Sequence, residues 1–303
     1  MKRFLKLFST IIAVMLACIC CVSVAGCGAN ITTAEVTLQL YDYDKDEFFA
    51  ESDVKVTVDL YGHLAPKTVE AMTKYINEGY YNNAIVYKMT DFNQLMVGDL
   101  VLADGAEGVV IEDEGATVNI IQNPVVKPGL PGEFEYGGTK GSNLTNKKGS
   151  IGLWRSWYAL GTDWMSTAAL KTGRATWYMP TETLGSYDDY FCVFGQLNFE
   201  KDATEKAFSE LTSIFSSSSN YTTFIIYFTG EYDTTKPDEN YGLTFHCVTQ
   251  EYFDGLEEDE KEALGIFEAE GAQLECFNQY KIRIPNNSAD GKLGAMIKSA
   301  KTI

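Results

Sequence analysis

Cys27 is the residue whose neighbours point most directly to a chemical event. It follows the small residues Val24-Ala25-Gly26, which end an apolar stretch that begins at Phe8, and three basic residues lie within the first six positions. A basic start, an apolar run and small residues before a cysteine are typical of a bacterial lipoprotein signal. We therefore expect loss of residues 1–26, attachment of lipid to Cys27, and a short tether over residues 27–34.

Lipid on Cys27 would hold the protein on the outer, extracytoplasmic face of the cell membrane. The alternative is an uncleaved membrane helix, because the apolar stretch is nearly long enough to cross a bilayer. The formal net charge is -18, and loss of the basic signal would make the mature chain still more acidic. Such a surface is a poor match for nucleic acid, and anionic headgroups would repel it. The lipid must therefore provide the anchor, since two or more acyl chains hold durably.

Histidine and cysteine usage excludes several kinds of active site. His63 and His246 are the only histidines, so neither a Ser-His-Asp triad nor a zinc site is expected. Beyond the signal and Cys27, the sequence leaves Cys192, Cys247 and Cys276, an odd number without metal spacing. Cys192 lies in an apolar segment and is expected to be buried, whereas a bridge between Cys247 and Cys276 stays open. We expect no metal and no cofactor.

The elements that must position any site begin with alternating hydrophobic residues. Residues 35–41 and 54–61 alternate as half-buried strands do. A helix is predicted from 68 to 78, with Gly79 as its stop. A second helix, 203–215, has one apolar face.

Several motifs along the chain occur together, in this order, in one known family. They are the Ala65-Pro66-Lys67-Thr68-Val69-Glu70 turn into the first helix, Gly98-Asp99, the Pro-Gly-Glu-Phe loop and Lys-Lys-Gly turn within 127–153, the strand Tyr190–Leu197, and the closing strand Met296–Ala300. Together they resemble a cyclophilin-type peptidyl-prolyl cis-trans isomerase.

The resemblance implies a mainly β fold. Its centre would be a closed, eight-stranded antiparallel β-barrel capped by two helices, formed by residues 35–215 together with 293–303. Residues 216–292 exceed what the family needs, and we interpret them as an α+β insertion packed on the barrel. Within the insertion, we predict strands at 221–229, 241–249 and 274–284. An acidic helix from 254 to 267 is expected to begin with a capping box of Asp254 and Glu257.

The resemblance also implies where a substrate groove would lie. In cyclophilins an arginine donates to the substrate around its proline, and Lys88 aligns with that arginine as the candidate catalytic residue. Lysine keeps the charge but lacks the planar fork of donors. The other groove positions of the family also hold different residues here: Asn93, Met96, Trp154, Thr176, Tyr178 and Phe191.

These substitutions decide how much catalysis can be expected. Rotation about the amide bond has a barrier of about 18–20 kcal/mol, and a catalyst must bind the twisted amide better than the planar forms. Most of the directed polar groups are replaced, while an apolar surface remains. Whether the protein is an enzyme stays open. It is a weak isomerase acting on X-Pro segments of exported proteins, a peptide-binding chaperone on a cyclophilin frame, or an adaptor whose partner surface is the 216–292 insertion.

Overall fold

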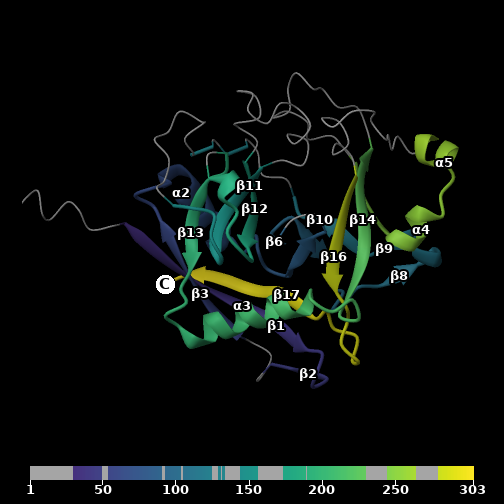
Figure 1. Ribbon diagram of the computed structural model, residues 1–303, viewed down its shortest axis with the longest axis horizontal. Helices are drawn as coiled ribbons and strands as arrows, with labels where there is room; N and C mark the ends of the chain where they lie inside the picture. The colour runs from purple at the N-terminus through teal and green to yellow at the C-terminus, as the bar shows by residue number, and fades with distance from the viewer. Residues whose placement is uncertain are drawn as a thin grey trace, which may run out of the picture.

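Two long strands near the start of the chain and one near its end form the frame of the computed structural model (Figure 1). β1 (Ile31–Asp42) pairs antiparallel with β3 (Val54–Tyr61) on one side and with β17 (Ala295–Thr302) on the other. The structure describes residues 30–49, 54–90, 93–103, 105–124, 129–130, 132–133, 144–155, 173–188, 190–229, 244–263 and 279–303.

These strands belong to a nearly closed antiparallel barrel, as predicted. The chain segment 84–89 completes the ring, because its first half pairs with β17 and its second half with β6. Only Val86 separates these two halves. Around the ring the order is β17, β1, β3, β13 (Val193–Leu197), β11 (Ser150–Arg155), β12 (Gly173–Pro180), β6 (Gln94–Val97), and then β5 (Tyr87–Met89) with β4 (Ala84–Ile85).

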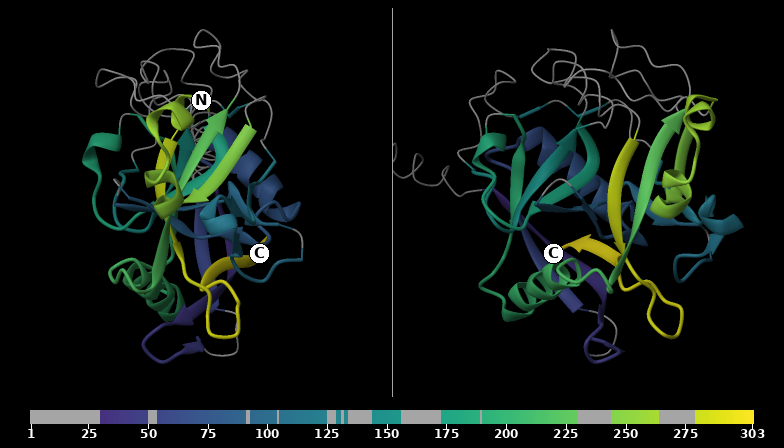
Figure 2. Two further views of the ribbon diagram at one scale, coloured as in Figure 1. Left: turned by 90° about the vertical axis from the view of Figure 1, so that its right-hand side faces the viewer. Right: turned by 45° about the vertical axis from the view of Figure 1, so that its right-hand side comes forward.

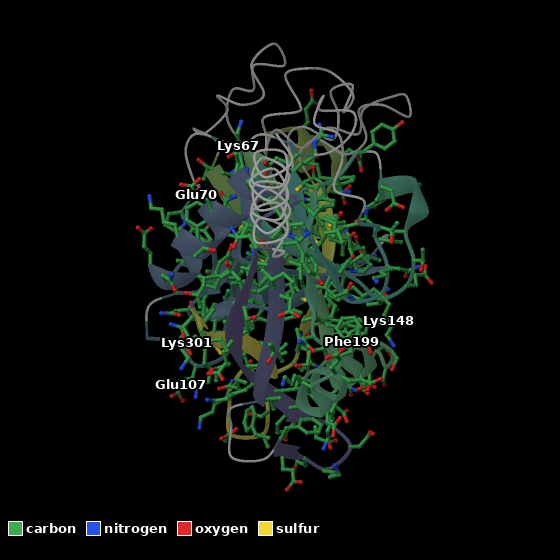
Figure 3. All side chains as sticks on the ribbon, turned by 90° about the vertical axis from the view of Figure 1, so that its left-hand side faces the viewer. Lys67, Glu70, Glu107, Lys148, Phe199 and Lys301 are labelled. Atoms are coloured by element: carbon green, nitrogen blue, oxygen red, sulfur yellow. The ribbon has the colours of Figure 1, made fainter. Side chains whose placement is uncertain are left out.

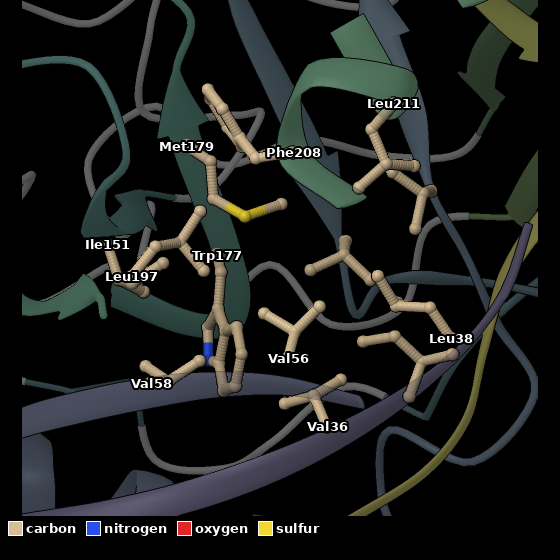
Figure 4. A pocket seen from close by; sticks show the side chains of 13 residues that line it. Val36, Leu38, Val56, Val58, Ile151, Trp177, Met179, Leu197, Phe208 and Leu211 are labelled. Atoms are coloured by element: carbon tan, nitrogen blue, oxygen red, sulfur yellow. The ribbon is translucent and has the colours of Figure 1, made fainter. Parts of the chain in front are cut away.

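Alternation along each strand fills the barrel with apolar side chains. Every second residue of β1 and β3 points inward, and Trp177 of β12 is among the side chains that pack in the interior. The packing leaves a small cavity of about 30 Å³ with an entirely apolar lining (Figure 4). The interior is thus a packed core and offers no polar group to a ligand.

Helices α2 (Pro66–Asn77) and α3 (Asp202–Ile214) cap the barrel with their apolar faces, within two residues of the predicted bounds. Phe208 of α3 lines the interior cavity. Met72 of α2 accepts a hydrogen bond at its Sδ from Trp177 Nε1, at 3.2 Å. Gly79 follows α2 with a φ of 77°, the left-handed conformation that its predicted role as helix stop requires.

A remote carboxylate holds the N-terminus of α2. Glu133, which is buried, accepts from the backbone N–H groups of Lys67 at 3.1 Å and Thr68 at 2.7 Å. The first turn of a helix leaves such donors without intrahelical partners, and an anion there also interacts well with the helix dipole. The loop that carries the Pro-Gly-Glu-Phe motif is therefore tied to the helix that begins at the Ala-Pro turn.

An outer layer of strands grows from both halves of the segment 84–89. From β4, the sheet continues to β7 (Leu100–Leu102) and β10 (Ile120–Gln122). From β5 it continues to β16 (Gln279–Pro285), β14 (Tyr221–Thr229) and β15 (Thr244–Thr249), so the 216–292 segment joins the barrel through strand pairing (Figures 1 and 2). A second hydrophobic core fills the space between this layer and the outside of the barrel wall.

The prediction of one acidic helix that begins at Asp254 and runs to 267 is wrong. The described part consists of two short helices, α4 (Gln250–Asp254) and α5 (Glu258–Ala263), which are separated by residues 255–257. Thr249 caps α4 by accepting from Tyr252 N at 3.2 Å. Asp254 is therefore the last residue of α4 and caps no helix, because Thr249, five residues earlier, provides the cap.

The remaining short elements are β2 (Glu47–Phe48), β8 (Ile111–Glu112), β9 (Thr117–Val118) and the 3₁₀ turns η2 (Asp113–Gly115) and η6 (Gly185–Tyr187).

Candidate functional site

The outer face of the barrel wall at β5, β6 and β12 brings several predicted groove residues together. Met96 of β6 lies opposite Tyr87 of β5 and Tyr178 of β12 in the antiparallel ladders. Residues directly opposite one another share a face. Thr176 is two residues from Tyr178 on the same strand and so shares this face as well.

Trp154, Tyr178 and Phe191 form an aromatic wall on this face, together with Tyr187 of η6. The rings of Trp154 and Phe191 stack with centroids 5.6 Å apart, and Tyr178 meets Phe191 edge-on at the same distance. Phe191 also stacks on Tyr187, at 4.7 Å. We use the name aromatic wall for these four residues. Such ring pairs contribute about 0.5–1.5 kcal/mol each beyond the area that they bury.

Tyr178 is fixed at both ends of its side chain. Its hydroxyl donates to Asn146 Oδ1, and the amide of Asn146 is itself held by Asp188 Oδ1, at 2.9 Å from Asn146 Nδ2. Beneath the ring, Gly152 leaves no room for a side chain, because a Cβ there would lie 2.0 Å from Tyr178 Cζ. Burial raises the pKa of Tyr178 well above its usual value, so the hydroxyl stays a donor at neutral pH.

The residues of the predicted groove on this face are buried. Met96 and Tyr178 have no exposed surface, and Trp154, Thr176 and Phe191 are between 1% and 4% exposed. Met96, Trp154, Tyr178 and Phe191 belong to the core beneath the outer layer, together with residues of β14 and β16 such as Phe224 and Ile282. A prolyl ring can contact this surface only if the covering residues move.

Lys88 lies on the opposite face. It is paired with Leu95 of β6, which packs in the barrel interior, while its neighbour Tyr87 faces the aromatic wall. Successive side chains of a strand point to opposite faces, so the structure does not bring Lys88 together with Met96 and Tyr178. Its side chain is half-buried. Burial lowers its pKa, and the nearby Arg283 adds to the effect.

Asn93 is exposed and takes part in a polar contact. Its Nδ2 donates to Glu182 Oε1 at 2.5 Å, and its carbonyl accepts from the backbone N–H of Thr181 at 2.9 Å. The structure thus separates the predicted groove into five buried residues on one face of the sheet and two polar residues, Lys88 and Asn93, that lie apart from them.

Arg283, like Tyr187 and Asn146, is a residue of this region that the sequence alone did not identify. It lies directly opposite Lys88 across β5 and β16, and its guanidinium carbon is 5.0 Å from the ring centroid of Tyr221. The alternation Lys281-Ile282-Arg283-Ile284 was a visible strand signal. What the pattern lacked was any indication that this strand pairs with β5.

Comparison with known proteins places the chain in a family. The family model described as cyclophilin type peptidyl-prolyl cis-trans isomerase/CLD matches residues 48–213. The chain belongs to the cyclophilin family. No curated protein matches it.

Two solved cyclophilin structures show a likeness. One is a Cryptosporidium parvum cyclophilin type peptidyl-prolyl cis-trans isomerase, with 11% identity over 58% of this chain and 83% of the other, at a TM-score of 0.34. The second is the same isomerase in the presence of the dipeptide Ala-Pro, with 10% identity over 72% of this chain and 95% of the other, also at 0.34. Neither likeness bears on the activity of this chain.

The two cysteines that the structure describes, Cys192 and Cys247, are buried. Cys192 has a pKa raised to about 12 by burial, and its Sγ lies 3.7 Å from Thr68 Oγ1. Cys247 is a free, buried thiol, whereas Cys276 and Cys27 lie outside the described residues.

Among the residues that the structure describes, no group of histidine, cysteine and carboxylate side chains could hold a metal ion. Within the same residues, no helix has the length and apolar character needed to cross a membrane.

Proposed function

We propose that this protein is a membrane-anchored, extracytoplasmic cyclophilin that acts on X-Pro segments of exported proteins with weak isomerase activity. Membership of the family supports the reaction class, and the sequence around Cys27 supports the anchor. The weakness of the activity rests on one observation: the side chains aligned with the family's groove are buried, between 0% and 4% exposed for the five on the aromatic face.

Burial lowers the apparent activity, because only the fraction of molecules in which the groove residues are uncovered can bind substrate. If the covering residues open at a cost of about 2.7 kcal/mol, about 1% of the molecules are competent, and apparent activity falls about 100-fold. The buried face also offers few directed donors to a twisted amide, because most of its predicted groove residues are apolar or aromatic: Met96, Trp154, Tyr178 and Phe191. Lys88 and Arg283 lie on the other face, and the cation that reaches the wall is the buried Arg155, whose guanidinium carbon is 5.9 Å from the ring centroid of Phe191.

Exchange spectroscopy on a short Ala-Pro peptide tests the proposed activity. The full chain in a nanodisc should accelerate cis/trans exchange only when it is present at micromolar concentration or above. Because Lys88 faces away from the wall, Lys88→Ala should change the acceleration by no more than about twofold. The matched control is Lys201→Ala, because Lys201 is an exposed lysine that precedes α3.

Two outcomes would contradict this proposal. Acceleration at nanomolar protein would mean that the wall is open in solution. A complete absence of acceleration at high protein concentration would leave the second candidate, a catalytically impaired peptide-binding chaperone or adaptor on a cyclophilin frame. The continuous core between barrel and outer layer favours that candidate, because it makes the barrel a support for the 216–292 segment.

The anchor is tested separately. Cys27→Ser should move the protein from the membrane fraction to the soluble fraction, provided that the signal is still removed by another route, and should abolish incorporation of a labelled fatty acid. Cys192→Ser is the matched control, because that thiol is buried in the barrel. Fatty acid on the Cys27→Ser variant would disprove attachment at this position.

A further inference from the structure

Three basic side chains form a strip where β5 of the barrel pairs with β16 of the outer layer. Lys281 and Arg283 lie on β16, and Lys88 lies on β5 directly opposite Arg283. Lys281 and Arg283 are two residues apart on one strand and so project from the same face. All three side chains are half-buried, which means that part of each is accessible to a partner. We call these three residues the basic strip.

The strip lies on a different face from the aromatic wall. Ile282 and Ile284, which alternate with Lys281 and Arg283, are buried in the core beneath the outer layer, so Lys281 and Arg283 face away from it. On the strip's face, Arg283 is paired with Thr223 of β14 and Lys281 with Ile225. A partner that binds the strip would therefore leave the buried wall undisturbed.

The strip places like charges side by side. Like charges directly opposite one another in a sheet are destabilising, yet Lys88 and Arg283 hold this position in a chain with a net charge of -18. None of the three forms an ion pair with a described residue within 4 Å. Glu182 is the carboxylate close enough to affect Lys88, and its Oε1 is already occupied by Asn93.

We propose that the basic strip binds an extended segment of another polypeptide that carries carboxylates at alternate positions. Lys281 and Arg283 are separated by about 6.6 Å along the strand, the same repeat as that of every second side chain in an extended chain. The planar fork of Arg283 suits a carboxylate, and its position against Tyr221 restricts its orientation. A single small anion would use one cation and leave the others unpaired, whereas an extended acidic segment reaches all three.

Fluorescence anisotropy with a labelled peptide of alternating threonine and glutamate tests this proposal. The full chain is held in a nanodisc of neutral lipid, and a threonine–glutamine peptide of the same length serves as the neutral probe. Arg283→Gln and Lys281→Gln should each weaken binding of the acidic peptide about fivefold, as expected for half-buried ion pairs, and high salt should weaken it further. Glu182→Gln should strengthen binding, because it removes the neighbouring negative charge.

Lys201→Gln removes the same charge from an exposed site before α3 and should leave the affinity unchanged. The proposal is overturned if the neutral peptide binds as tightly as the acidic one, or if Lys201→Gln weakens binding as much as Arg283→Gln. It is also overturned if inorganic phosphate or vesicles of anionic lipid compete as well as the acidic peptide at equal charge. Circular dichroism of each variant separates loss of binding from loss of fold.

Discussion

Replacing Trp154 with alanine is expected to destabilise the protein by about 3–5 kcal/mol, because a large buried aromatic leaves a cavity when it is truncated. Trp154 is 1% exposed and stacks on Phe191 within the core that joins barrel and outer layer. A groove residue would behave differently: its truncation would change ligand binding and leave stability nearly intact. The free energy of unfolding, measured with denaturant, therefore distinguishes a core from a groove.

Two further variants make the Trp154 result decisive. Trp154→Phe retains a ring and should lose much less stability than Trp154→Ala. Ile121→Ala removes a side chain that is 45% exposed on β10, and we expect it to be within about 0.5 kcal/mol of the parent. If Trp154→Ala unfolds at the same denaturant concentration as Ile121→Ala, the aromatic wall is open in solution and the site must be reconsidered.

Gly152→Ala is the second substitution with a large expected effect, about 3 kcal/mol of destabilisation from overpacking. A Cβ at this position would lie 2.0 Å from Tyr178 Cζ and 2.3 Å from its Cε1. The ring cannot move aside cheaply, because its hydroxyl donates to Asn146 and the ring meets Phe191 edge-on at 5.6 Å. The same denaturant experiment measures the loss.

A double-mutant cycle identifies the cause of the Gly152 effect. Tyr178→Leu is destabilising by itself, but in that background Gly152→Ala should cost far less than it does beside the intact ring. Gly185→Ala is the matched control, since nothing lies within 4 Å of a Cβ built there. Additive effects of Gly152→Ala and Tyr178→Leu would show that the clash is not the reason for the loss.

Much of the frame follows from local patterns in the sequence. The alternation of Val54 to Tyr61 gave the bounds of β3 without error, and the apolar face of α3 contains the residues expected from its periodicity. The burial of Cys192 was also predictable, because it lies in an apolar run. These features depend on neighbours along the chain, which a sequence displays directly.

The arrangement of the site depends on pairings that the sequence does not display. A shift of one residue in register moves a side chain to the other face of a sheet, so alignment with the family's arginine could not decide which way Lys88 points. Its partner Arg283 lies on a strand almost two hundred positions later. The burial of Met96, Trp154 and Tyr178 likewise results from an outer layer whose docking place had no local signal.

The pairing of β1 with β17 has a consequence for how the molecule comes into being. The first strand of the barrel cannot complete its pairing before the last strand is present, because Ala34 pairs with Thr302 and Leu40 with Ala295. Until that final stretch has been synthesised, β1 presents an unpaired edge of the kind that invites association with other chains. Contacts so distant along the chain are slow to form, so a newly made molecule passes through a vulnerable interval in which a chaperone would be of most use to this protein itself.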